Sequence, residues 1–78
     1  MNFDVIIINP EILGGTPVFK GTRVPVESLF AHLERGISID EFLDDFPTVS
    51  REQVLSVLEI AEKLTTSKNL KSLYENTA

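Results

Sequence analysis

The sequence has 78 residues, with seven basic and twelve acidic side chains, a formal net charge of −5 and no cysteine. A chain of this length forms one small domain, which buries only about 60% of the surface that its unfolded chain exposes. The missing cysteines exclude disulfides and thiolate metal sites, and the acidic balance argues against strong unaided binding to nucleic acid.

The first recognisable element is the β-branched apolar run Val5–Ile8, which Asn9 and Pro10 bound. It predicts a short strand, either buried on both faces or covered by a partner chain. A small core without disulfides is commonly reinforced by association, so we expect a homodimer. The run is far too short for a signal peptide or a membrane span, and a chain without cysteine fits the reducing cytoplasm.

Residues 14–26 are rich in glycine and proline. They cannot form a regular helix, because glycine permits positive φ and proline removes a backbone donor. Within this stretch, apolar residues flank the polar centre Lys20-Gly21-Thr22-Arg23. That pattern predicts a small β-hairpin whose tip presents Lys20 and Arg23. Residues 1–25 are therefore expected to form a β arm followed by this hairpin.

The hydrophobic period becomes helical after Pro25. Pro25 suits the first position of a helix over residues 25–35, and Gly36 suits the position just after its end. His32 falls on the polar side of this helix and is expected to be a surface residue. The apolar residues at helical spacing, which define the buried face, are Val26, Leu29, Phe30 and Leu33.

Two capping boxes mark the next two helices. Ser38 with Glu41 opens the second helix, and Ser50 with Gln53 opens the third, which is expected over residues 51–64. Each helix presents one apolar face to its neighbours, so three short-linked helices predict a compact trihelical unit. The connection between the second and third helices has helix-turn-helix length.

These elements divide a single domain of residues 1–78 into the β arm, a trihelical unit over residues 26–65 and a C-terminal segment over residues 66–78. Phe30 and Phe42 are expected to be central rings of the core. The C-terminal segment is expected either to pack as a final short helix or to order when a partner binds.

The segment Lys20–Arg23 has three interpretations. A nucleotide-binding loop is discarded, because lysine precedes glycine here and no full α/β sheet can follow in this length. As a tight turn, the segment would let Thr22 bond local backbone and Arg23 pair with a carboxylate such as Glu27. As a binding site, it would present the guanidinium fork to phosphate or to a partner's carboxylates. The candidate partner-binding residues of this segment are Lys20, Gly21, Thr22 and Arg23.

The second helix carries an acidic face. This face is either a solvated surface that keeps the domain soluble or a patch that meets a basic protein surface. Asp40 and Asp44 are its partner-binding candidates. The full set of acidic residues on this face is Asp40, Glu41, Asp44 and Asp45.

The third helix is a poor DNA-reading helix. Apolar residues cover more than half of its circumference, and its polar arc offers Glu52 and Glu59 against Lys63. A core helix that also builds a dimer contact is the favoured interpretation. If DNA is bound, the candidate contacts are Lys20, Arg23 and Arg51.

No catalytic, metal-binding or cofactor-binding residues are assigned. One histidine, His32, without cysteine or a matched second ligand makes no zinc site, and no serine or threonine has a recognisable base beside it. The acidic face of the second helix could hold only a weak magnesium ion, so we expect a protein that is not an enzyme.

The segment Gly14–Val26, with its Gly-Thr-Arg core, resembles the signature of the small prokaryotic domain-of-unknown-function 433 family. The likeness continues through Gly36–Phe42, Phe46–Ser50 and Gln53–Leu55 and covers most of the chain. The resemblance implies a mainly α, homeodomain-like trihelical fold of helix-turn-helix type behind a short strand and a small β-hairpin. It supplies no catalytic residues.

The resemblance also implies a role as the antitoxin of a toxin–antitoxin pair, commonly beside a PIN-like ribonuclease. We therefore expect a non-enzymatic regulatory domain that neutralises a protein toxin of that kind. Autoregulation through operator DNA, bound by a dimer, is an optional second activity. The alternatives are a helix-turn-helix DNA-binding regulator without a toxin and a structural protein-interaction module.

Overall fold

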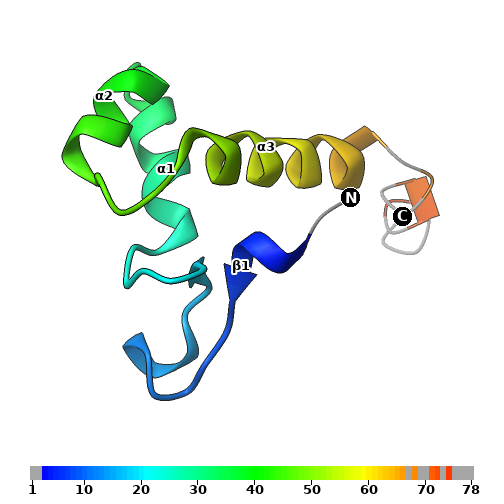
Figure 1. The fold of residues 1–78 in the computed structure, drawn as a ribbon. Helices are drawn as coiled ribbons and strands as arrows, with labels where there is room; N and C mark the ends of the chain where they lie inside the picture. The colour runs from blue at the N-terminus through cyan, green and yellow to red at the C-terminus, as the bar shows by residue number, and fades with distance from the viewer. Residues whose placement is uncertain (1–2, 67, 69–70, 73, 75–78) are drawn as a thin grey trace.

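The computed structural model describes residues 3–66, 68, 71, 72 and 74. Within these residues, three α-helices follow a two-stranded antiparallel sheet, and the expected small trihelical fold behind a β element is confirmed (Figure 1). The predicted C-terminal segment over residues 66–78 lies largely outside the described residues. The elements in chain order are η1 (Phe3–Val5), β1 (Ile6–Ile7), η2 (Leu13–Gly15), β2 (Val18–Phe19), α1 (Val26–Glu34), α2 (Ile39–Asp45) and α3 (Arg51–Thr66).

The predicted strand over Val5–Ile8 is shorter than expected and is not buried on both faces. Only Ile6 and Ile7 pair with β2, both are half-buried, and Ile8 is 67% exposed. The pairing is short because β2 is flanked by Pro17, which has no N–H, and by the turn that begins after Phe19. Whether a partner chain covers β1 stays a prediction.

The boundaries of α1 follow the proline and glycine signals with one correction. Pro25 is the N-cap, with an extended ψ of 138°, and not the first helical residue as predicted. Gly36 follows the C-cap at a φ of +78°, a left-handed conformation that glycine adopts without the steric cost of a Cβ. The helix therefore ends where the sequence predicted.

The predicted capping box at Ser50 and Gln53 is complete, and at Ser38 the structure shows its N-cap half. The Ser38 hydroxyl accepts a hydrogen bond from the Glu41 amide at 3.1 Å and opens α2. At the start of α3, the Ser50 hydroxyl accepts from the Gln53 amide at 3.1 Å, and the Gln53 side-chain oxygen accepts from the Ser50 amide at 3.0 Å. This reciprocal pair satisfies two donors that the first helical turn leaves unbonded.

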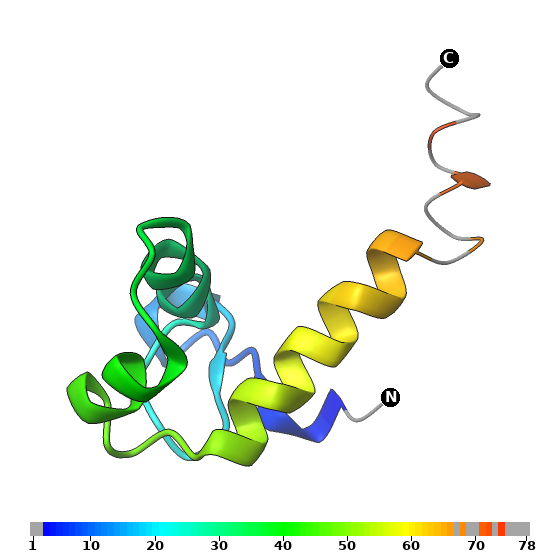
Figure 2. The ribbon, with the colours of Figure 1, turned by 90° about the horizontal axis from the view of Figure 1, so that it is seen from above.

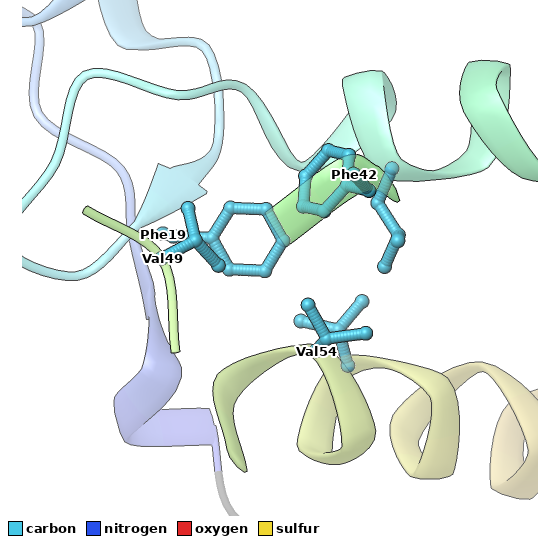
Figure 3. Close-up of a cluster of buried hydrophobic side chains, with 6 residues drawn as sticks. Phe19, Phe42, Val49 and Val54 are labelled. Carbon is cyan, nitrogen blue, oxygen red and sulfur yellow. The ribbon is translucent and has the colours of Figure 1, made fainter. Parts of the chain in front are cut away.

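The core lies where β2 meets the three helices. Figure 3 shows Phe19 and Phe42 beside Val49 and Val54, and the two ring centroids are 6.1 Å apart. Phe42 is fully buried as expected, whereas Phe30 is only half-buried and packs at the edge of the cluster. The buried residues of this cluster are Phe19, Leu29, Phe42, Val49, Val54 and Val57.

Helix α3 extends beyond the other two helices. The N-terminal η1 lies alongside it in both views of the ribbon (Figures 1 and 2). Val57 and Ile60 are buried on α3, while Leu55 and Leu64 are about half exposed, at 52% and 48%. No helix among the described residues is long and apolar enough to cross a membrane.

His32 is not the surface residue that its position on the helix predicted. Its side chain is 19% exposed, and its ring meets the rings of Phe42 and Phe46 edge-on at centroid distances of 5.2 and 5.6 Å. The Nδ1 atom lies 2.7 Å from the Ser28 carbonyl oxygen, and Nε2 lies 3.5 Å from an Asp45 carboxylate oxygen. The prediction was wrong because Phe42 of α2 and Phe46, the C-cap of that helix, pack over this side of α1.

Candidate interaction site at the Lys20–Arg23 turn

The segment after β2 is the tip of a hairpin, as predicted. The Thr22 amide donates to the Phe19 carbonyl at 3.0 Å, and Gly21 holds a φ of +78°. Just behind the tip, the Phe19 amide donates to the Val24 carbonyl at 3.0 Å. These bonds close a tight turn over Phe19–Thr22, and its positive φ is the reason that glycine stands at its third position.

The Thr22 hydroxyl braces this turn from inside. It donates to the Phe19 carbonyl at 2.8 Å and accepts from the Val24 amide at 3.0 Å. Loss of the hydroxyl would leave the Val24 amide without its acceptor, and this loss is costly because both bonds are partly buried. The predicted local role of Thr22 therefore agrees with the geometry.

Two longer-range hydrogen bonds fix the turn to the rest of the domain. The Lys20 amide donates to the Val5 carbonyl at 2.9 Å, beside the β1–β2 pairing. The Lys20 carbonyl accepts from Nε2 of Gln53 on α3 at 3.0 Å. The sequence indicated Gln53 as part of the capping box that opens α3. No sequence signal indicated its hydrogen bond to the Lys20 carbonyl.

Arg23 projects from this fixed turn. It is exposed, and the structure pairs it with no carboxylate among the described residues, so the alternative of an Arg23–Glu27 brace is not observed there. Arg23 lines an open hollow of about 630 Å³ and is the one charged side chain among the described residues of that lining. The hollow is otherwise lined by Ile7, Ile12, Val18, Gly21, Thr22, Val24 and Thr48.

The acidic residues of α2 lie outside this hollow and have partly separate roles. Asp40 forms an exposed ion pair with Arg51, which is the predicted DNA contact at the start of α3. Asp44 and Asp45 are both exposed, and a carboxylate oxygen of Asp45 lies near the ring of His32. The structure therefore brings Lys20, Gly21, Thr22 and Arg23 together with Gln53, and it pairs Arg51 with Asp40 on the α2–α3 side.

The lining of the hollow suits recognition of another molecule. Among the described residues, no group of three His, Cys, Asp or Glu side chains could hold a metal ion. Apolar walls with a single guanidinium at the rim suit an apolar segment that carries a carboxylate or a phosphate group. The overall acidity of the chain makes this local positive charge distinctive.

Comparison with known proteins places most of the chain in one family. A family described as "Protein of unknown function (DUF433)" matches residues 6–61. The uncharacterized protein y4eO of Sinorhizobium fredii is 39% identical over 51 residues, which are 65% of this chain and 23% of that protein. The chain therefore spans about a quarter of the length of this relative.

A solved structure shares the fold. The crystal structure of a DUF433 member protein from Anabaena variabilis aligns with a TM-score of 0.68 at 28% identity, over 78% of this chain and 60% of that chain. The agreement between two chains of modest identity supports the arrangement of three helices behind a short sheet. The names of these two proteins state no activity.

Proposed function

The chain belongs to the DUF433 family of proteins of unknown function, and from that premise we propose that it is a non-enzymatic regulatory domain. In this proposal it acts as an antitoxin that binds and neutralises a PIN-like ribonuclease. The Lys20–Arg23 turn and the hollow beside it make the principal contact with the ribonuclease.

The observation that carries the proposal is the position of Arg23. Its guanidinium stands exposed at the rim of an apolar hollow, on a turn held by hydrogen bonds to η1, α3 and its own backbone. A planar fork of five donors suits paired carboxylates, and lysine cannot reproduce that geometry. A fixed turn also reduces the ordering cost of binding, because little conformational freedom is left to lose.

The mechanism follows from the chemistry of the expected partner. A PIN-like ribonuclease is expected to hold clustered carboxylates around a metal ion. An arginine that enters such a site neutralises those carboxylates and competes with the metal, which blocks phosphodiester cleavage. The apolar hollow receives the neighbouring apolar side chains of the ribonuclease, and burial of that surface supplies further binding free energy.

The acidic face of α2 is a second contact in this proposal. Asp44 is exposed, and the ion pair that Asp40 forms with Arg51 is itself exposed to solvent. Both carboxylates therefore remain accessible to a basic RNA-binding surface. DNA binding by the isolated chain is expected to be weak, because Arg51 is engaged by Asp40 and the α2 face is acidic. We expect a homodimer to combine two turns for any operator contact.

Inhibition of the ribonuclease encoded in the adjoining reading frame tests the proposal. We would measure cleavage of a single-stranded RNA oligonucleotide with increasing amounts of the parent chain and of Arg23→Ala, Arg23→Lys and Arg35→Ala. Removing the Arg23 fork should raise the inhibition constant by about tenfold to a hundredfold, because a charge-assisted pair is lost. Arg23→Lys should be nearly as damaging.

Arg35 is the matched control, since it is also an exposed arginine but caps the far end of α1. Arg35→Ala should leave the inhibition constant within about threefold of the parent, as expected for a surface charge outside the contact. If Arg23→Ala inhibits as well as the parent and instead lowers the melting temperature, Arg23 is a local brace and the proposal is wrong.

A further inference from the structure

The side chain of Gln53 makes two hydrogen bonds, one to its own helix cap and one to a distant part of the chain. Its oxygen accepts from the Ser50 amide at 3.0 Å, and its Nε2 donates to the Lys20 carbonyl at 3.0 Å. The first bond completes the cap of α3. The second spans 33 positions in the sequence and ends on the turn that carries Arg23.

The two bonds fix the orientation of the side-chain amide. An amide oxygen only accepts and an amide nitrogen only donates, while the backbone N–H of Ser50 only donates and the carbonyl of Lys20 only accepts. A reversed amide would place two donors together at one end and two acceptors at the other. Gln53 is therefore held in one orientation by two partners that belong to different elements.

This tie complements the other bonds of the turn. The Lys20 amide is held by Val5 at the end of η1 and the Lys20 carbonyl by α3, so both backbone groups of this residue have partners outside the turn. Thr22 holds the inner side through its hydroxyl. Without Gln53, the turn would lose its fixed position relative to α3, and the local bonds that close it would open more often.

We infer that Gln53 is a positioning residue, which holds the Lys20–Arg23 turn against the start of α3 so that Arg23 meets a partner from a fixed direction. The inference rests on the proposed function for the role of Arg23, while the tie itself is a property of this chain alone. A glutamate at this position would complete the same capping box but could not donate to Lys20.

This difference between glutamine and glutamate supplies a test. Gln53→Glu keeps an oxygen for the Ser50 amide and removes the donor to the Lys20 carbonyl. Gln53→Ala removes both bonds. Amide hydrogen exchange, followed by NMR on the full chain, reports the turn through the amides of Thr22 and Val24, and it reports α3 through the amide of Val54 as an internal reference.

In Gln53→Glu, the Thr22 and Val24 amides should exchange about threefold to tenfold faster relative to Val54, the change expected for one lost hydrogen bond. The inhibition constant toward the adjoining-frame ribonuclease should rise by a similar factor. Gln53→Ala removes the cap of α3 as well, so the amides of Thr22, Val24 and Val54 should all exchange faster than in the parent, and the inhibition constant should rise by a similar factor. Exchange at Thr22 and Val24 that stays within twofold of the parent, relative to Val54, would overturn the inference.

The two proposals fail in different ways. If Gln53→Glu speeds exchange in the turn and neither this variant nor Arg23→Ala changes inhibition, the tie stands and the proposed function is wrong. If Arg23→Ala weakens inhibition while Gln53→Glu speeds exchange without weakening it, the contact through Arg23 stands and the positioning role in binding is overturned.

Discussion

The aromatic core and the Lys20–Arg23 turn are neighbours in the chain but are held together by different forces. Phe19 is the last residue of β2 and is fully buried against Phe42. One residue later, Lys20 is exposed, and the turn is held by hydrogen bonds from Thr22, Gln53 and the backbone. Between Phe19 and Lys20, the main support of the chain therefore changes from hydrophobic burial to hydrogen bonding.

This contrast separates the residues that keep the fold from those that are free to bind. Hydrophobic burial is not directional and tolerates repacking, whereas hydrogen bonds fix a backbone in one geometry without covering it. In the proposed function, the turn presents an exposed arginine in a fixed direction, which requires the second kind of support. Variants in the two regions should produce different combinations of lost stability and lost binding.

The largest expected effect lies in the core. Phe42→Ala should lower the free energy of unfolding by about 3–5 kcal/mol, because it removes a fully buried ring that touches three others. Phe30→Ala should cost clearly less, since that ring is only half-buried at the edge of the cluster. Urea denaturation of both variants checks this order, and equal losses would contradict the observed position of Phe30.

A smaller loss is expected inside the turn. Thr22→Val keeps the shape of the side chain but removes the hydroxyl, which leaves the Val24 amide without its acceptor. The free energy of unfolding should fall by about 1–2 kcal/mol. Thr22→Ser is the matched control, because it retains the hydroxyl. If denaturant midpoints show that valine is tolerated as well as serine, the turn is not braced by this residue.

Gly21 and Gly36 form a matched pair that sharpens the comparison. Both hold a φ of +78°, and a Cβ added at either position would meet nothing within 4 Å. Alanine at either position should therefore cost about 1 kcal/mol of stability through backbone strain alone. Only Gly21→Ala should also weaken binding of the ribonuclease, which calorimetric titration measures, and equal binding by the two variants would contradict an interaction site at the turn.

The smallest effect is expected at the exposed ion pair between α2 and α3. Arg51 and Asp40 are 55% and 76% exposed, so solvent screens their attraction. Arg51→Ala should change the free energy of unfolding by less than about 1 kcal/mol, and thermal melting measures this change. A larger loss would mean that this pair fixes the angle between the two helices.

The sequence predicted most of the local structure of the chain. Ser38 and Ser50 marked the starts of α2 and α3 because a capping box satisfies local donors, and Gly36 marked the end of α1 for a similarly local reason. The hairpin tip followed from the glycine and proline spacing. The family was also identified from the segment around Gly21–Arg23.

The features that were missed depend on contacts between distant parts of the sequence. His32 occupies a polar position on α1, and it is covered because the rings of Phe42 and Phe46 pack against it. The hydrogen bond from Gln53 to Lys20 and the ion pair between Arg51 and Asp40 likewise join separate elements. Helical periodicity and capping patterns describe one element at a time, so they carry no information on such pairs.

The location of the partner contact is the central claim, and chemical-shift mapping tests it most directly. Two-dimensional NMR spectra of the labelled chain would be recorded while the adjoining-frame ribonuclease is added. The account predicts that the largest changes fall on the amides of Gly21, Thr22 and Arg23 and on the Arg23 side-chain Nε–H. Changes confined to the acidic face around Asp44, with the turn unaffected, would contradict it.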